Sequence, residues 1–138
     1  MNSAWFLAGG AIFAILGLLH AIYTLADTAQ PSRLVPDDPA VLQQMRASGL
    51  RLARGGTTMW RAWVGFNFSH SIGAILFGVL SMILAPAWHA LGLPKPLLVL
   101  PLMIALLYLW LALRYWFRIP AIGIALAASC LAIGWWQY

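Results

Sequence analysis

The chain has 138 residues, of which 63% are hydrophobic and only 8% are charged, with a formal net charge of +5. Soluble domains carry about a quarter charged residues, and a small domain leaves much of its surface in water. The composition therefore excludes a water-soluble globular protein and predicts an integral membrane protein. The basic residues flank the apolar runs, which is typical of membrane topology signals and argues against nucleic acid as a partner. The single cysteine, Cys130, excludes an internal disulfide and a Cys-x-x-Cys motif.

The first apolar run covers residues 4–26, and Asp27 follows it. A helix of this length crosses a hydrocarbon core of ~30 Å. The run has no basic residue before it and is too long for a signal peptide, so we expect a retained helix. His20, Tyr23 and Asp27 recur at helical spacing and form a polar stripe near its end.

The segment 28–57 is the only long polar stretch. Asp38 followed by Pro39 predicts a helix start, with an N-cap and a proline in the first turn. We predict an amphipathic helix over residues 40–53 that lies in the membrane interface on the cytoplasmic side. A lid over the polar site is the alternative interpretation of this segment.

Three further apolar runs predict membrane-spanning helices at about residues 58–84, 97–117 and 120–136. The predicted fold is all-α: one membrane domain over residues 1–138, with four antiparallel transmembrane helices in a bundle and an interfacial helix between the first two. Trp135, Trp136 and Tyr138 predict an aromatic belt at the far end of the last helix.

The distribution of basic residues predicts the orientation. Only Lys95 lies in the second loop, whereas the first and third loops are flanked by arginines: Arg33, Arg46, Arg51, Arg54, Arg61, Arg114 and Arg118. The positive-inside rule places the first and third loops in the cytoplasm and both termini outside it.

Polar residues interrupt the second span at Asn67, Ser69, His70 and Ser71. Polar side chains at membrane depth are costly and usually face a bundle interior, a cavity or a ligand. Counted from the cytoplasmic helix ends, His20 lies ~9 Å deep, Asn67 ~13 Å and His70 ~18 Å. We therefore expect His20 close to Asn67, with His70 one turn deeper.

These depths predict a polar cavity open to the cytoplasmic half. Its candidate catalytic residues are His20 and His70; the candidate ligand-binding residues are Tyr23, Trp63, Asn67 and Tyr108; and Asp27 and Arg61 are a candidate ion pair. The alternative is purely structural, because polar side chains also join helices by hydrogen bonds. Ser69 and Ser71 are expected to bond carbonyls of their own helix. Gly65, Ser69 and Gly73 form a ridge of small residues that predicts close contact with another helix.

Two motifs carry a resemblance to a known family. Leu19-His20-x-x-Tyr23, combined with Met59-Trp60-x-x-Trp63-x-Gly65-Phe66-Asn67-x-Ser69-His70-Ser71, resembles a group of small, uncharacterised bacterial membrane proteins with four helices. The similarity covers the first two spans and the loop between them. It implies a protein of the bacterial inner membrane and carries no known activity.

The function predicted from these residues is binding of a small lipophilic molecule, such as a quinone, a sterol-like lipid or another apolar metabolite, near His20, Asn67 and His70. Acid–base chemistry by the histidines would accompany it in a membrane enzyme. One alternative is a haem or metal site through His20 and His70, against which stands their expected offset of about two helical turns. An oligomeric transporter, or an accessory subunit of a larger membrane partner, would also fit the composition. The expected partners are the lipid bilayer and either further copies of the chain or a larger membrane protein. The residues identify no cofactor and no reaction.

Overall fold

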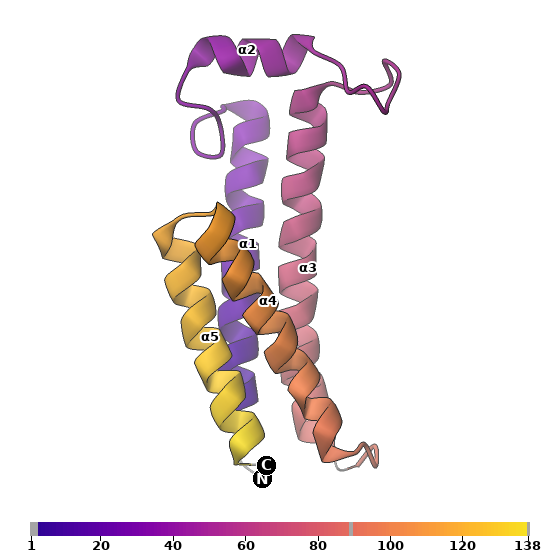
Figure 1. Ribbon diagram of the computed structural model, residues 1–138, viewed down its shortest axis with the longest axis vertical. Coiled ribbons are helices and arrows are strands. Elements are labelled where there is room, and N and C mark those ends of the chain that lie inside the picture. Colours follow the sequence, from indigo (N-terminus) through magenta and orange to yellow (C-terminus); the bar gives the residue numbers. More distant parts are fainter. Residues whose placement is uncertain (1–2, 89, 138) are drawn as a thin grey trace. The chain divides into compact units, whose positions relative to one another are not determined.

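A computed structural model describes residues 3–88 and 90–137 of the chain, so Tyr138 of the predicted aromatic belt lies outside it. Its helices are α1 (Ala4–Ala29), α2 (Pro39–Ala47), α3 (Met59–Ala87), the 3-10 helix η1 (Lys95–Leu98), α4 (Val99–Tyr115) and α5 (Arg118–Trp136) (Figure 1). Four segments are long and apolar enough to cross a membrane: α1, α3, η1 with α4, and α5. The predicted all-α fold with four transmembrane helices is thus confirmed, and it indicates a multi-pass membrane protein.

Several helix boundaries differ from the predicted ones. Helix α1 continues to Ala29 because the Asp27 side chain bonds the loop that follows and leaves the helical backbone intact. Helix α3 runs on to Ala87 and includes Pro86, whose missing N–H removes a single bond in the last turn.

Helix α2 begins as predicted but ends early. The Asp38 side chain accepts a hydrogen bond from the Ala40 N–H at 2.8 Å, which confirms the N-cap. The helix stops at Ala47 rather than near residue 53, because Gly49 pairs with Thr58 in an antiparallel bridge. The chain between them turns through left-handed backbone at Arg54 (φ 46°) and Gly55 (φ 90°), a conformation that a helix cannot contain.

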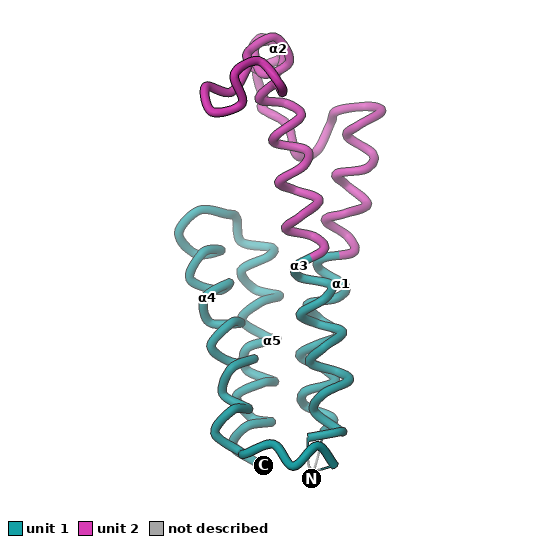
Figure 2. The backbone as a smooth tube through the Cα atoms, turned by 90° about the vertical axis from the view of Figure 1, so that its right-hand side faces the viewer, with its two compact units in different colours: residues 1–17, 73–138 teal, residues 18–72 magenta. Residues whose placement is uncertain are grey.

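The chain divides into two compact units (Figure 2). Unit 1 comprises Met1–Gly17 and Gly73–Tyr138, and unit 2 comprises Leu18–Ile72. Helices α1 and α3 contribute residues to both units, while η1, α4 and α5 belong to unit 1 and α2 belongs to unit 2.

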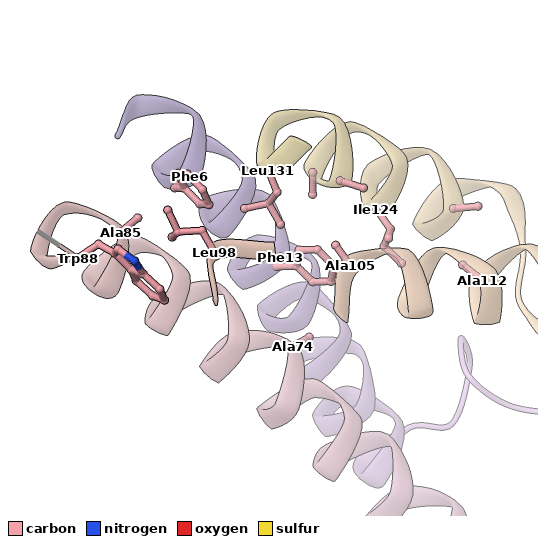
Figure 3. Packing of buried hydrophobic residues seen from close by; sticks show 13 residues of the cluster. Phe6, Phe13, Ala74, Ala85, Trp88, Leu98, Ala105, Ala112, Ile124 and Leu131 are labelled. Carbon is pink, nitrogen blue, oxygen red and sulfur yellow. The ribbon is translucent and has the colours of Figure 1, made fainter. Parts of the chain in front are cut away.

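Unit 1 is a bundle of four helices around an apolar core (Figure 3). Phe13 of α1 lies at its centre, with its ring centroid 4.7 Å from that of Phe77 on α3 and 5.5 Å from that of Tyr108 on α4. Both ring pairs are edge-to-face, the arrangement that aromatic quadrupoles favour. Helix α5 closes the core with small and branched side chains, among them Ala127 and Leu131, which are fully buried.

Helices α1 and α3 approach each other closely at Gly10 and Gly78. A Cβ atom added at Gly78 would lie 2.6 Å from the backbone nitrogen of Ala14, and one added at Gly10 would lie 2.5 Å from the carbonyl oxygen of Gly78. Only glycine permits this backbone contact. The close contact with another helix that was predicted at Gly65 was wrong, because a Cβ atom added to this residue meets no atom within 4 Å.

Unit 2 consists of the C-terminal part of α1, the N-terminal part of α3 and the segment between them, which contains α2. Helix α2 lies crosswise beyond these helix ends (Figure 1), and none of its residues is buried. Two backbone hydrogen bonds join the two sides of the turn between α2 and α3. The Met59 N–H donates to the Ser48 carbonyl at 2.9 Å, and the Leu50 N–H donates to the Thr57 carbonyl at 3.4 Å. The position of α2 at a membrane interface stays a prediction.

Candidate functional site

The centre of unit 2 is a polar contact between α1 and α3. His20 Nε2 lies 2.8 Å from Asn67 Oδ1, and the Asn67 side-chain Nδ2 donates to the Trp63 carbonyl at 2.8 Å. Asn67 is only 6% exposed. The structure therefore brings His20 and Asn67 together at a buried position, as the depth estimate predicts.

This chain of hydrogen bonds determines the chemistry of the His20 ring. Because Asn67 Nδ2 donates to its own helix, the atom it turns toward His20 is an acceptor. His20 must then donate through Nε2, which leaves Nδ1 with the ring's lone pair when the imidazole is neutral. An oriented imidazole with one nitrogen anchored is the arrangement used by histidine bases and by metal-ligating histidines.

His70 lies beside His20, with ring centroids 5.3 Å apart at 79°. The Phe66 ring stacks against the His70 ring, with centroids 6.5 Å apart. The predicted offset of about two turns between the histidines was wrong. The depth of His20 was counted from residue 26, whereas α1 continues to Ala29. Counted along each helix from its observed end, His20 lies about 14 Å deep and His70 about 17 Å deep.

Asp27 organises the loop that follows α1. Its carboxylate is 2% exposed and accepts the backbone N–H groups of Ser32 (2.9 Å), Arg33 (3.0 Å) and Leu34 (2.6 Å). Trp63 of α3 binds the same loop, since its Nε1 donates to the Leu34 carbonyl at 2.7 Å. A buried carboxylate thus obtains three N–H donors and the loop is fixed to both helices.

The predicted ion pair between Asp27 and Arg61 stays a prediction. The three backbone bonds leave acceptor capacity on the two carboxylate oxygens, and Arg61 lies on the exposed surface at the start of α3. Tyr23 interacts with a different arginine: the guanidinium carbon of Arg33 lies 4.5 Å from the centre of its ring.

Three hydroxyl side chains of unit 2 bond carbonyls of their own helices. The hydroxyls of Thr24, Ser69 and Ser71 donate to the carbonyls of His20, Phe66 and Asn67, respectively, each at 2.8 Å, as expected for such residues in apolar helices.

Tyr108, predicted as a ligand-binding residue, belongs to unit 1, where its ring contacts Phe13 and also lies 6.4 Å from Trp116.

Sequence reasoning missed the function of Asp27 as a loop anchor and the contribution of Trp63 Nε1. An aspartate directly after an apolar run was the available signal, but its partners are backbone groups, which any residues at 32–34 would supply. Within residues 3–88 and 90–137, no three His, Cys, Asp or Glu side chains are grouped as a metal site would need. Comparison of the chain with protein-family models, curated proteins and solved structures finds no match.

Proposed function

We propose that this protein, embedded in the bacterial inner membrane with both termini outside the cytoplasm, binds a small lipophilic molecule that carries a polar head. The head would contact His20 and His70, and Tyr23 and Trp63 would line the approach. Helix α2 would lie in the cytoplasmic interface, where arginines such as Arg46 meet lipid headgroups. The bacterial location derives from the family resemblance, and the orientation from the positive-inside rule.

The observation that carries the proposal is the anchored imidazole of His20. Its Nε2 is fixed by Asn67 at 2.8 Å, and Asn67 is fixed in turn by the Trp63 carbonyl. Nδ1 is then the acceptor of the ring, and the ring centroid of His70 lies 5.3 Å from that of His20. Hydroxyl or carbonyl groups of a quinone-like head are suitable partners, because binding sites in apolar surroundings rely on a few directed polar groups.

Acid–base chemistry at this site would follow from the two imidazoles. Because Nε2 donates to Asn67, neutral His20 accepts a proton at Nδ1. His20 and His70 would then take and return a proton of the bound head, with Asn67 as a positioning residue.

A haem bound between the two histidines fits the geometry less well. The Nε2 of His20 already bonds Asn67 Oδ1 at 2.8 Å, so His20 would have only Nδ1 left to coordinate a metal.

The test uses a short-chain ubiquinone as the probe, titrated into the full-length protein in nanodiscs and followed by quenching of tryptophan fluorescence. Loss of one hydrogen bond is worth about 0.5–1.5 kcal/mol. We therefore expect His20→Ala, His70→Ala and Asn67→Ala each to weaken binding by roughly 2- to 10-fold.

Ser69→Ala is the matched control, because Ser69 lies on the same helix, is exposed, and bonds only its own backbone at Phe66 among the contacts described. Binding by this variant should equal wild type. If all three site variants bound the ubiquinone as tightly as wild type, with unfolding temperatures unchanged, the proposal would be refuted. Iron, copper or zinc in the purified protein at one ion per chain, lost in His20→Ala, would instead favour the metal alternative.

A further inference from the structure

Unit 1 contains an apolar cavity of about 220 Å³ that is distinct from the histidine site. It is bounded by α1, α3, η1 and α4, through residues such as Phe6, Phe77, Leu98 and Ile104. These side chains come from segments far apart in sequence, so the cavity is a product of the tertiary packing of unit 1.

The polar side chains in the wall are already bonded within the protein. The Ser81 hydroxyl donates to the Phe77 carbonyl at 2.8 Å, and Trp88 Nε1 donates to the Pro94 carbonyl at 3.4 Å. The wall therefore offers a polar ligand little to bind. An apolar wall of this kind favours apolar molecules over water.

The cavity opens on the surface of helices that are long enough to cross a membrane. Leu80 of α3 and Leu100 of α4 both line it, and they are 51% and 52% exposed. At membrane depth the medium outside such residues is lipid hydrocarbon. A hydrocarbon chain entering from the bilayer restores the dispersion contacts that an empty cavity lacks.

We propose that the cavity binds an acyl chain of a bilayer phospholipid. Trp88 directly follows the last residue of α3, and Leu97 lies in η1, so both are close to the loop that connects these elements. This placement puts one end of the cavity near headgroup level, so the phospholipid head stays at the interface while its chain enters. Lys95, the first residue of η1, is exposed there and supplies a positive charge that suits a phosphate. All of these residues belong to unit 1, so the inference is independent of the proposed function.

Trp88 provides the direct test, because it lines the cavity and is only 6% exposed. The full-length protein is reconstituted in phosphatidylcholine whose acyl chains carry bromine, which quenches indole on contact. The Trp88 signal is obtained by subtracting the emission of Trp88→Phe from that of wild type. We expect this component to lose more than half of its intensity in brominated lipid. A Trp88 component that keeps its full intensity would overturn the proposal.

A second variant tests occupancy by filling the cavity. Ala85 is 3% exposed and lines it, so Ala85→Leu places carbon atoms where the chain would lie. Phospholipid retained by the purified protein, counted by native mass spectrometry, should fall by about one molecule per chain in this variant. Leu126→Phe on the exposed face of α5 is the control and should retain wild-type lipid. Equal retention by Ala85→Leu and wild type would contradict the assignment, and if Ala85→Leu fails to fold, the quenching of Trp88 decides alone.

Discussion

Asp27→Asn is the most informative single substitution in unit 2. An aspartate near a helix C-terminus is disfavoured by the helix dipole by about 0.3–1 kcal/mol, so the three N–H groups of residues 32–34 must outweigh that cost. The asparagine amide keeps one oxygen. If that oxygen stays with Ser32 and Arg33, an NH₂ group faces the Leu34 N–H, which lies 2.6 Å from Oδ2 in the wild type. If the amide turns over, the other two bonds are lost.

The expected effect is local. Each hydrogen bond to a charged group contributes about 1.5–3 kcal/mol, and 1.4 kcal/mol corresponds to about a tenfold change. We therefore expect amide hydrogen exchange at Leu34 to accelerate by roughly 10- to 100-fold, measured by mass spectrometry on protein in nanodiscs. Trypsin should also cleave after Arg33 sooner than in wild type.

Asp38→Asn is the control for this experiment. Asp38 caps α2 through the Ala40 N–H, and its side chain acts within the first turn of that helix, so exchange at Leu34 should not change. Unaltered exchange at Leu34 in Asp27→Asn would show that the carboxylate does not hold the loop.

Two further predictions concern the α1–α3 pair. Gly78→Ala places a methyl group 2.6 Å from the Ala14 backbone nitrogen, and overpacking of this kind costs about 1–3 kcal/mol. The unfolding temperature of this variant in detergent should therefore fall. Gly65→Ala, with open space around the added methyl group, should have an unfolding temperature that matches or exceeds that of wild type. Trp63→Phe removes the Nε1 bond to the Leu34 carbonyl, worth about 0.5–1.5 kcal/mol. Tryptic cleavage of the adjacent loop should therefore quicken, by less than in Asp27→Asn, and an unchanged rate would contradict the role given to this indole.

The four spans were predictable because hydropathy and length alone decide whether a helix can cross a bilayer. The start of α2 was predictable for a local reason: the Asp38 cap and Pro39 act on backbone within one turn. Its end depends on the pairing of Gly49 with Thr58 across a turn, and no local rule places that bridge.

The candidate site was predictable only in part. Depth counting placed His20 near Asn67, since two antiparallel helices joined at one end bring equal depths together. The same counting misplaced His20 relative to His70, because the depth of His20 depends on where α1 ends. Asp27 extends that helix by binding a loop whose path the sequence does not specify. The pairing of Gly10 with Gly78 was not predicted, because small residues show where close approach is allowed and only the packing of both helices selects the point of contact.

The turn after α2 has a practical consequence for work on this protein. Gly49 and Thr58 hold its two ends together, while Leu52 at its tip is 97% exposed. Exposed loop tips accept inserted sequence, and an insertion here would cost only the local turn bonds from Ala53 N–H to the Leu50 carbonyl and from Arg54 N–H to the Arg51 carbonyl. A short epitope inserted after Leu52 would keep the paired ends in register, and its accessibility to antibody in sealed, oriented vesicles would tell which side of the membrane α2 faces.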